Sequence, residues 1–369
     1  MTGRERVTCA VEHRTPDRIP IAEHFWEDTL SRWRSEGFPE GVSPDDYFDF
    51  DIIHLGVDPS PRFRAYLIDE DGEWRTLQDR FGYVVRMVKG KSRTMDYISH
   101  PVGNRDDWTR VKEMFVLKQG ETARIDDVAF PFRLEPEPTW EEMREKYRRL
   151  HGTGKYLLGT AYGPHEAVWR MRGFTETLYD LVLDPEFVGE IAWVYIGFLM
   201  QVLKKGIDEG VVLDGFMMVD DIAATRGMLF SPDQWRAIYK PHIARLGSFL
   251  HDNGIHFWMH SCGNGEAVFD DLIECGLDVI NPLEAKSGLD VRTLKNRYGS
   301  CLAFYGNIDV IAMTESEEAV GREITAKLES FRTGGGYIAH SDHSIPPEIS
   351  FERYRYVVDL VRREGVCAV

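Results

Sequence analysis

A histidine and a cysteine stand two residues apart directly after an apolar segment. His260 ends the run 256–260, and Cys262 and Gly263 follow it. On an extended backbone, side chains two residues apart point to the same side. An imidazole and a thiolate side by side are good ligands for Zn²⁺. The spacing therefore predicts a metal site, or else a buried cysteine beside a histidine bonded to neighbouring backbone.

A second group of polar residues follows the apolar run 336–339. His340, Asp342 and His343 fall within four residues, and each is a possible metal ligand or acid–base group. The alternative is a polar turn before Pro346-Pro347.

Two adjacent carboxylates, Asp220 and Asp221, follow the run 215–219. Neighbouring side chains on an extended backbone point to opposite sides, so we expect only one to face a site. There it would ligate metal, act as a base or hold a substrate. The alternative is a helix cap, for which Asp is well suited.

Three more residues are candidates on weaker grounds. Asp51 is flanked by apolar residues, so it is either buried and paired or part of a site, and His54 has the same two interpretations. Asn307 follows Tyr305-Gly306 and is placed to hydrogen-bond a substrate, whereas Asp309 would cap the next helix.

These groups follow short apolar runs bounded by turn residues, which are typical of strands buried on both faces. The eight runs are 18–22, 50–55, 156–160, 215–219, 256–260, 278–281, 301–305 and 336–339. Helical patterns separate the later runs, at 232–252 after the N-cap Ser231, at 266–274 and at 315–331. Alternating strands and helices predict an α/β fold, a (β/α)₈ TIM barrel, with its chemistry at the carboxyl ends of the strands.

An insertion is expected between the second and third runs. Segments 65–68, 74–77, 83–89 and 94–98 alternate around the turn signals Asp71-Gly72 and Lys89-Gly90. We predict a β-meander over roughly 62–130, inserted over one end of the barrel in a single domain of residues 1–369.

Composition limits the partners. The 369 residues include 44 basic and 61 acidic side chains, a formal net charge of −17, which argues against nucleic-acid binding. We expect no membrane span and, from the charged N-terminus, no secretory signal. Five scattered cysteines favour a reducing, cytoplasmic location.

The chain resembles the uroporphyrinogen decarboxylase superfamily in several motifs that agree in order and spacing. They are Glu5-Arg6-Val7, Pro16-Asp17-Arg18-Ile19-Pro20, His260-Ser261-Cys262-Gly263-Asn264, Gly276-Leu277-Asp278, Asn281-Pro282, Tyr298-Gly299, Tyr305-Gly306-Asn307-Ile308-Asp309, Gly335-Gly336-Tyr337 and His343-Ser344-Ile345-Pro346-Pro347. The resemblance implies a (β/α)₈ barrel. The superfamily contains metal-free porphyrinogen decarboxylases and zinc-dependent methyltransferases, which move methyl groups between corrinoid proteins and acceptors such as coenzyme M.

The decarboxylase branch fits one part of the chain poorly. Those enzymes carry an arginine-rich loop after the first strand, where this chain has Glu23, Glu27 and Asp28. Bidentate recognition of carboxylates needs arginine. Residues similar to Asp51 and His343 are functional in the decarboxylases, so a metal-free decarboxylase or lyase stays an alternative, as does a non-catalytic barrel that binds a small molecule or corrinoid.

The methyltransferase branch carries a histidine, a cysteine two residues later and a distant cysteine as zinc ligands. The resemblance implies His260, Cys262 and His343 here, with histidine in place of the last cysteine. It also implies a corrinoid (cobalamin) methyl carrier, with a corrinoid protein as a possible partner. Asp220 or Asp221 would orient the small-molecule substrate or shuttle its proton. The expected pocket residues are His24, Trp26, Tyr162, Trp169 and His340.

Overall fold

A central eight-stranded sheet organises the molecule, for which a computed structural model describes residues 1–91, 95–126, 134 and 136–367. The strand order is β14-β13-β12-β11-β8-β7-β1-β6. The strands are β1 (Ile52–Val57), β6 (Ile125–Asp126), β7 (Tyr156–Tyr162), β8 (Gly215–Val219), β11 (His256–His260), β12 (Val279–Asn281), β13 (Ala303–Tyr305) and β14 (Tyr337–Ile338). All neighbours pair in parallel except β6, which runs antiparallel to β1. The predicted α/β class with a mostly parallel sheet is confirmed.

Residues 20 and 21 form backbone hydrogen bonds to the residue that follows β14 and to the residue that precedes β1. The Ala339 N–H donates to the Pro20 carbonyl (2.8 Å), and the Asp51 N–H donates to the Ile21 carbonyl (2.9 Å). The run 18–22, expected as a first strand, forms only isolated bridges. Pro20 has no N–H to continue a ladder, which explains why no regular strand forms there.

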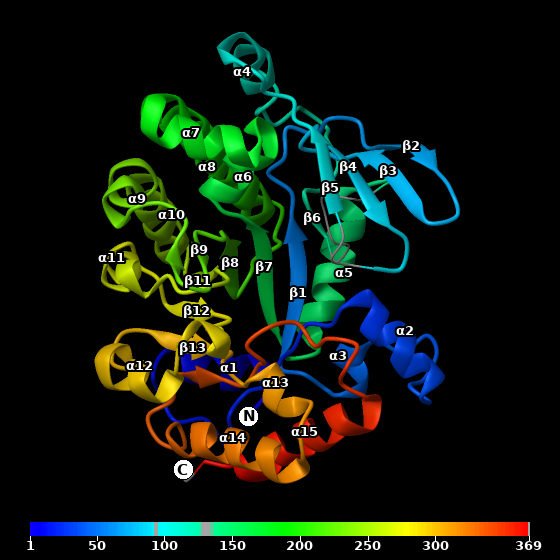
Figure 1. The fold of residues 1–369 in the computed structure, drawn as a ribbon, viewed down its shortest axis with the longest axis vertical. Coiled ribbons are helices and arrows are strands. Elements are labelled where there is room, and N and C mark those ends of the chain that lie inside the picture. The colour runs from blue at the N-terminus through cyan, green and yellow to red at the C-terminus, as the bar shows by residue number, and fades with distance from the viewer. Residues whose placement is uncertain (92–94, 127–133, 135, 368–369) are drawn as a thin grey trace.

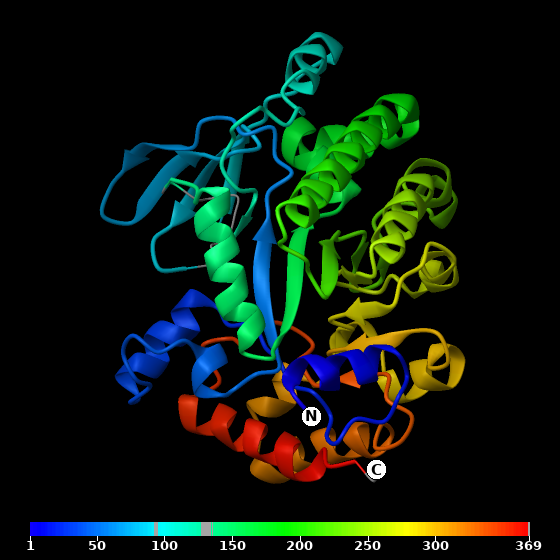
Figure 2. The same ribbon diagram turned by 180° about the vertical axis from the view of Figure 1, so that it is seen from behind.

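Helices cover the outside of the sheet (Figures 1 and 2). They are α1 (Gly3–Val11), α2 (Glu27–Ser35), α3 (Pro44–Tyr47), α4 (Arg105–Lys112), α5 (Trp140–Gly152), α6 (Pro164–Arg172), α7 (Phe174–Leu183), α8 (Pro185–Asp208), α9 (Pro232–Ile238), α10 (Lys240–Asp252), α11 (Phe269–Glu274), α12 (Val291–Tyr298), α13 (Val310–Met313), α14 (Glu317–Glu329) and α15 (Phe351–Glu364). Short 3₁₀ turns occur at Glu266–Val268 and Ala285–Ser287.

One predicted helix is divided in two. The pattern at 232–252 indicated a single helix, but α9 ends at Ile238 and α10 begins at Lys240. Pro241 lacks the N–H that would bond to the carbonyl four residues earlier, and its ring crowds that carbonyl, so a continuous helix is interrupted here. The predicted N-cap holds, since Ser231 and Gln234 form a capping box at the start of α9.

A separate four-stranded antiparallel sheet lies between β1 and α4. Its strands pair in sequence order: β2 (Tyr66–Glu70), β3 (Trp74–Gln78), β4 (Val84–Val88) and β5 (Met95–Ser99). Asp71 stabilises the first turn by accepting N–H bonds from Glu73 (2.8 Å) and Trp74 (2.7 Å). Of the stretch assigned to the meander, 92–94 and 127–130 lie outside the described residues.

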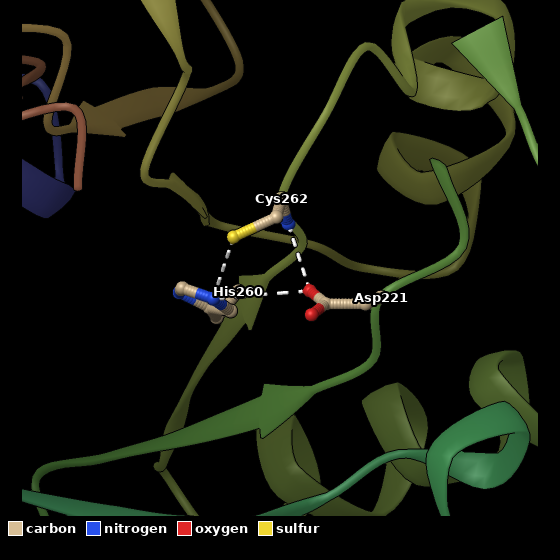
Figure 3. A group of neighbouring side chains, drawn as sticks. All are labelled: Asp221, His260 and Cys262. Carbon is tan, nitrogen blue, oxygen red and sulfur yellow. Dashed lines mark hydrogen bonds and ion pairs between the residues drawn. The ribbon is translucent and has the colours of Figure 1, made fainter. Parts of the chain in front are cut away.

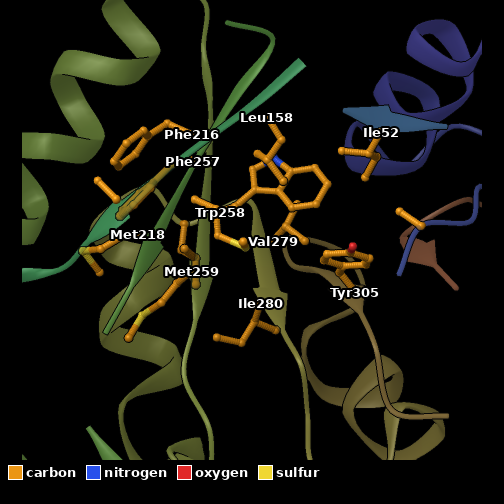
Figure 4. Packing of buried hydrophobic residues seen from close by; sticks show 14 of the residues in the cluster. Ile52, Leu158, Phe216, Met218, Phe257, Trp258, Met259, Val279, Ile280 and Tyr305 are labelled. Atoms are coloured by element: carbon orange, nitrogen blue, oxygen red, sulfur yellow. The ribbon is translucent and has the colours of Figure 1, made fainter. Parts of the chain in front are cut away.

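The interior of the central sheet is a packed apolar core (Figure 4). Trp258 is fully buried, with its ring centroid 5.6 Å from that of Tyr156 and 5.6 Å from that of Tyr305. Such aromatic pairs each contribute about 0.5–1.5 kcal/mol beyond their buried area. Because the middle of the sheet is filled, chemistry is confined to the loops at its carboxyl ends.

Helix α8 is long and apolar enough to cross a membrane by length and composition, with a mean hydropathy of 1.4 over its most apolar window. More than half of that window is buried within the protein, as in the core helix of a folded domain. The helix is therefore only weak support for a membrane span.

Candidate functional site

Three side chains meet where β8 and β11 end (Figure 3). Sγ of Cys262 lies 3.5 Å from Nε2 of His260, and Oδ1 of Asp221 lies 3.8 Å from the same nitrogen. The strand register pairs Val219 with His260, so the residues that follow each strand are neighbours. The Cys262 N–H also donates to Oδ1 of Asp221 (2.8 Å), which holds the carboxylate beside the thiol.

Asn281 fixes which nitrogen of His260 faces this group. It lies opposite His260 in the register of β11 with β12, and its amide N–H donates to the Tyr305 carbonyl (2.8 Å). Oδ1 of Asn281 therefore points to Nδ1 of His260, 2.5 Å away, and accepts its hydrogen. Nε2 is left with its lone pair toward Cys262, as a histidine ligand requires.

A second pair of possible ligands approaches the same sulfur atom. Ligand atoms of Cys262, Glu284 and His343 all lie within 4.8 Å of one another. Oε2 of Glu284 is held by the Gly263 N–H (3.0 Å) and by the Ser287 hydroxyl (3.0 Å). His260 and His343 thus each lie near Cys262, in two separate groups that share this thiol, and all three predicted ligands line one cavity. Glu284 was missed, although it follows the run 278–281 as the other candidates follow theirs.

The charges around the thiol favour a cation. Burial raises the pKa of Cys262, and the carboxylates of Asp221 and Glu284 raise it further. A thiol in these surroundings keeps its proton unless a positive charge replaces it. Each of the two groups that share Cys262 offers one sulfur, one imidazole and one carboxylate, which are ligands that suit Zn²⁺, so the residues fit this metal.

A cavity of about 350 Å³ opens beside these groups. Its wall includes Asp221, His260, Cys262 and His343 together with His24, Trp26, His340, Met217 and Pro282. The structure therefore places His24, Trp26 and His340, three of the expected pocket residues, around a space that fits a small organic molecule.

Tyr162 and Trp169 do not line this cavity, so their prediction as pocket residues is wrong. The guanidinium of Arg170 lies over both rings, 3.9 Å from the centroid of Tyr162 and 4.4 Å from that of Trp169. Phe81, in the loop between β3 and β4, packs against Tyr162 (5.6 Å between centroids), and Tyr97 of β5 packs against Trp169 (5.1 Å). The small sheet covers both side chains.

Only one of the adjacent carboxylates Asp220 and Asp221 faces the cavity, as the alternation of side chains predicted. Asp220 is fully buried, and its Oδ1 accepts the Glu166 N–H (2.8 Å) in the first turn of α6. Burial raises the pKa of Asp220 well above its usual value. Asp220 therefore caps a helix, which corrects its prediction as a catalytic group, and Asp221 is the carboxylate that faces the cavity.

Asp51 and Asn307 are also structural, contrary to the catalytic roles predicted for them. Asp51 precedes β1, at the end of the sheet opposite the cavity, and accepts hydrogen bonds from Arg6 (2.6 Å) and Arg18 (2.8 and 3.0 Å). The fully buried Asn307 accepts the Val291 N–H and donates to two backbone carbonyls. Asp309 caps α13, the alternative given for it.

Glu23, one of the acidic residues at the position of the decarboxylases' arginine-rich loop, is buried. Its buried carboxylate accepts hydrogen bonds from the N–H (3.0 Å) and hydroxyl (2.7 Å) of Ser341. It therefore anchors the loop that carries His340 and His343.

Comparisons with known proteins agree with this fold. Residues 137–364, more than half of the chain, match the model of the uroporphyrinogen decarboxylase (URO-D) family. The uroporphyrinogen decarboxylase of Thermus thermophilus is 30% identical over 138 residues, 36% of this chain and 37% of that protein. That of Pelobacter propionicus is 26% identical over 139 residues, 38% and 40% of the two chains. The matches thus span less than half the length of these relatives.

A solved structure, a methyltransferase from Methanosarcina mazei, is similar over almost the whole length. It covers 98% of this chain and 99% of its own, with a TM-score of 0.64 and 14% sequence identity. At this identity the likeness shows a shared fold.

Proposed function

The chain belongs to the uroporphyrinogen decarboxylase family, and we propose that it is a metal-dependent methyltransferase or demethylase of that family. It moves a methyl group between a small organic molecule and a corrinoid at the mouth of the central sheet, which closes as a (β/α)₈ barrel through residues 18–22. We place this activity in the cytoplasm. A corrinoid protein is its expected partner.

The observation that carries the proposal is the ligand set around Cys262. His260, His343, Asp221 and Glu284 surround one thiol at the wall of the cavity. A metal-free decarboxylase of the kind considered from the sequence would use Asp51, but both oxygens of that carboxylate are bonded to arginines at the far end of the sheet. The residues at hand therefore favour metal-assisted group transfer.

Each residue has a distinct task in this proposal. His260, Cys262 and His343 would hold Zn²⁺, with Glu284 or Asp221 as a further ligand. The metal supplies Lewis acidity, which lowers the pKa of a substrate thiol, hydroxyl or amine. Asn281 keeps Nε2 of His260 available, and Asp221 orients the substrate's polar group or holds its proton. Trp26, Met217 and Pro282 pack against the organic part and exclude water.

Methyl transfer from methylcobalamin tests the proposal. The purified chain, loaded with zinc, is mixed with methylcobalamin and a panel of thiols, phenols and amines, and the demethylated corrinoid is followed by its absorbance. We expect turnover with at least one acceptor, lost in Cys262→Ala and retained in Cys301→Ala, which changes an exposed thiol. Decarboxylation of uroporphyrinogen without zinc, or ligand binding without turnover on any donor, would contradict the proposal.

A further inference from the structure

A buried carboxylate and two histidines form a hydrogen-bonded chain that ends at the cavity but includes none of the proposed ligands. Oε1 of Glu23 lies 3.0 Å from Nε2 of His340, and the same nitrogen lies 3.1 Å from Nδ1 of His24. The side chains of Glu23 and His340 are each only 3% exposed. His24 lines the cavity, so one end of the chain meets the substrate space.

The hydrogen positions in this chain follow from its end groups. Nδ1 of His340 lies at the Ser341 carbonyl oxygen, which only accepts, so Nδ1 carries a hydrogen in every state. Nε2 of His340 is then the variable atom. Without a hydrogen it accepts from Nδ1–H of His24, and Nε2 of His24 is an acceptor. With a hydrogen it donates to Glu23, and His24 takes the tautomer with a hydrogen on Nε2.

We propose that Glu23, His340 and His24 are a proton relay that exchanges one proton with a molecule in the cavity through Nε2 of His24. The proton enters at Nε2 of His24, the hydrogen on Nδ1 of His24 passes to Nε2 of His340, and the resulting imidazolium pairs with the Glu23 carboxylate. His24 is neutral before and after. The reverse sequence returns the proton to the cavity.

The relay has a use in the proposed reaction, on which this part of the inference rests. A heteroatom that loses its methyl group becomes an anion and needs a proton, whereas one that receives a methyl group must give a proton away. His24 is then a catalytic residue, and His340 and Glu23 are positioning residues that act through it.

The surroundings of the chain keep it close to neutral. His24 and His340 are faced by His54 and His260, and His340 also by His343. Glu23 is faced by Tyr354 of α15 and by Tyr305 of β13. Burial raises the pKa of Glu23 and lowers that of His340. The buried carboxylate beside the neutral imidazole therefore favours taking up one proton, which the pair then holds between Oε1 of Glu23 and Nε2 of His340.

A purely structural carboxylate would behave differently from a relay. Oε1 of Glu23 accepts from the His24 N–H (3.0 Å) and the Ser341 hydroxyl, and Oε2 accepts from the Ser341 N–H. Glutamine keeps one of these two acceptor oxygens but cannot balance an imidazolium. Tyr354→Phe is the control for a lost acceptor bond, because it removes the bond from the Tyr354 hydroxyl to Oε2 of Glu23 (3.4 Å) and leaves the charge of the carboxylate.

The test is ¹⁵N NMR of the full, zinc-loaded chain with labelled histidines, assigned with His24→Gln and His340→Gln. In the wild type and in Tyr354→Phe, His24 is expected to change from the Nδ1–H to the Nε2–H tautomer as pH falls. In Glu23→Gln it should stay in the Nδ1–H tautomer. An unchanged titration of His24 in Glu23→Gln overturns the relay, as does a His24 that never changes tautomer.

A second readout separates this inference from the proposed function. If methyl transfer is observed, Glu23→Gln should lower kcat and change its pH profile while KM stays near the wild-type value. If the tautomer change is found without methyl transfer, the relay stands and the proposed reaction fails. If methyl transfer has the same pH profile in both proteins, the catalytic use of the relay is refuted.

Discussion

Replacing Asn281 by alanine should weaken zinc binding without touching a proposed ligand. The change removes the acceptor that holds Nδ1–H of His260 at 2.5 Å, so the imidazole is free to rotate and to exchange its tautomer. Loss of such an orienting group costs about 10–100-fold in metal affinity, or about 1.4–2.7 kcal/mol. The change also leaves the Tyr305 carbonyl without its donor, which should lower the stability by about 1–3 kcal/mol.

The control is Asn253→Ala, which removes an amide that donates to the Phe249 carbonyl (2.8 Å) at the end of α10, before β11 begins. It should lower the melting temperature but change the zinc Kd by no more than about twofold, because it lies at the amino end of β11, away from the site. Zinc affinity is measured by competition with a chromogenic chelator, and folding by circular dichroism. Equal affinity in Asn281→Ala and the wild type, or equal losses in both variants, would refute the orienting role of Asn281.

Three further predictions concern the ligand set and the fold. Glu284→Gln should weaken zinc binding by at least about tenfold, whereas Glu266→Gln, at an ion pair with Arg297, should not; equal chelator titrations of the two variants would exclude Glu284 as a ligand. Asp51→Asn should reduce the unfolding free energy by about 3 kcal/mol, because Arg6 and Arg18 lose their buried partner, and should leave methyl transfer per folded molecule unchanged; loss of activity in the folded variant would restore the decarboxylase-type role of Asp51. Burial raises the pKa of Asp79 to about 8. Between about pH 4 and pH 8 the unfolded chain therefore releases a proton that the native state keeps, and the unfolding free energy falls as pH rises. Urea titrations should show a smaller fall for Asp79→Asn than for the wild type, and an equal pH dependence in the two proteins would contradict the raised pKa of Asp79.

The sequence was sufficient for the elements that carry the site, because strand ends and side-chain alternation are local properties. The runs 215–219 and 256–260 are the strands β8 and β11. Side-chain alternation alone predicted that only one of Asp220 and Asp221 would face the site. The catalytic role predicted for Asp51 was wrong for a reason that the sequence already held. The predicted run 50–55 put Asp51 at the amino end of its strand, and β1 begins at Ile52, whereas barrel chemistry lies at the carboxyl ends.

The remaining differences come from contacts between distant segments. Tyr162 and Trp169 do follow a strand toward the carboxyl end, but Phe81 and Tyr97 of the small sheet cover them. Glu284 reaches the site because Leu283 adopts a left-handed conformation (φ 63°) and the Gly263 N–H holds the carboxylate. Neither the covering of Tyr162 and Trp169 nor the position of Glu284 can be predicted from a local sequence pattern.

The zinc content and zinc ligands of the purified chain test the central claim most directly. After loading with zinc and removal of excess metal, we predict about one zinc per chain, with X-ray absorption showing one sulfur ligand at about 2.3 Å among nitrogen and oxygen ligands. Cys262→Ala should lose both the sulfur signal and most of the metal. Less than about a fifth of an equivalent of zinc in the wild type, or the same content and ligands in Cys262→Ala, would contradict the account.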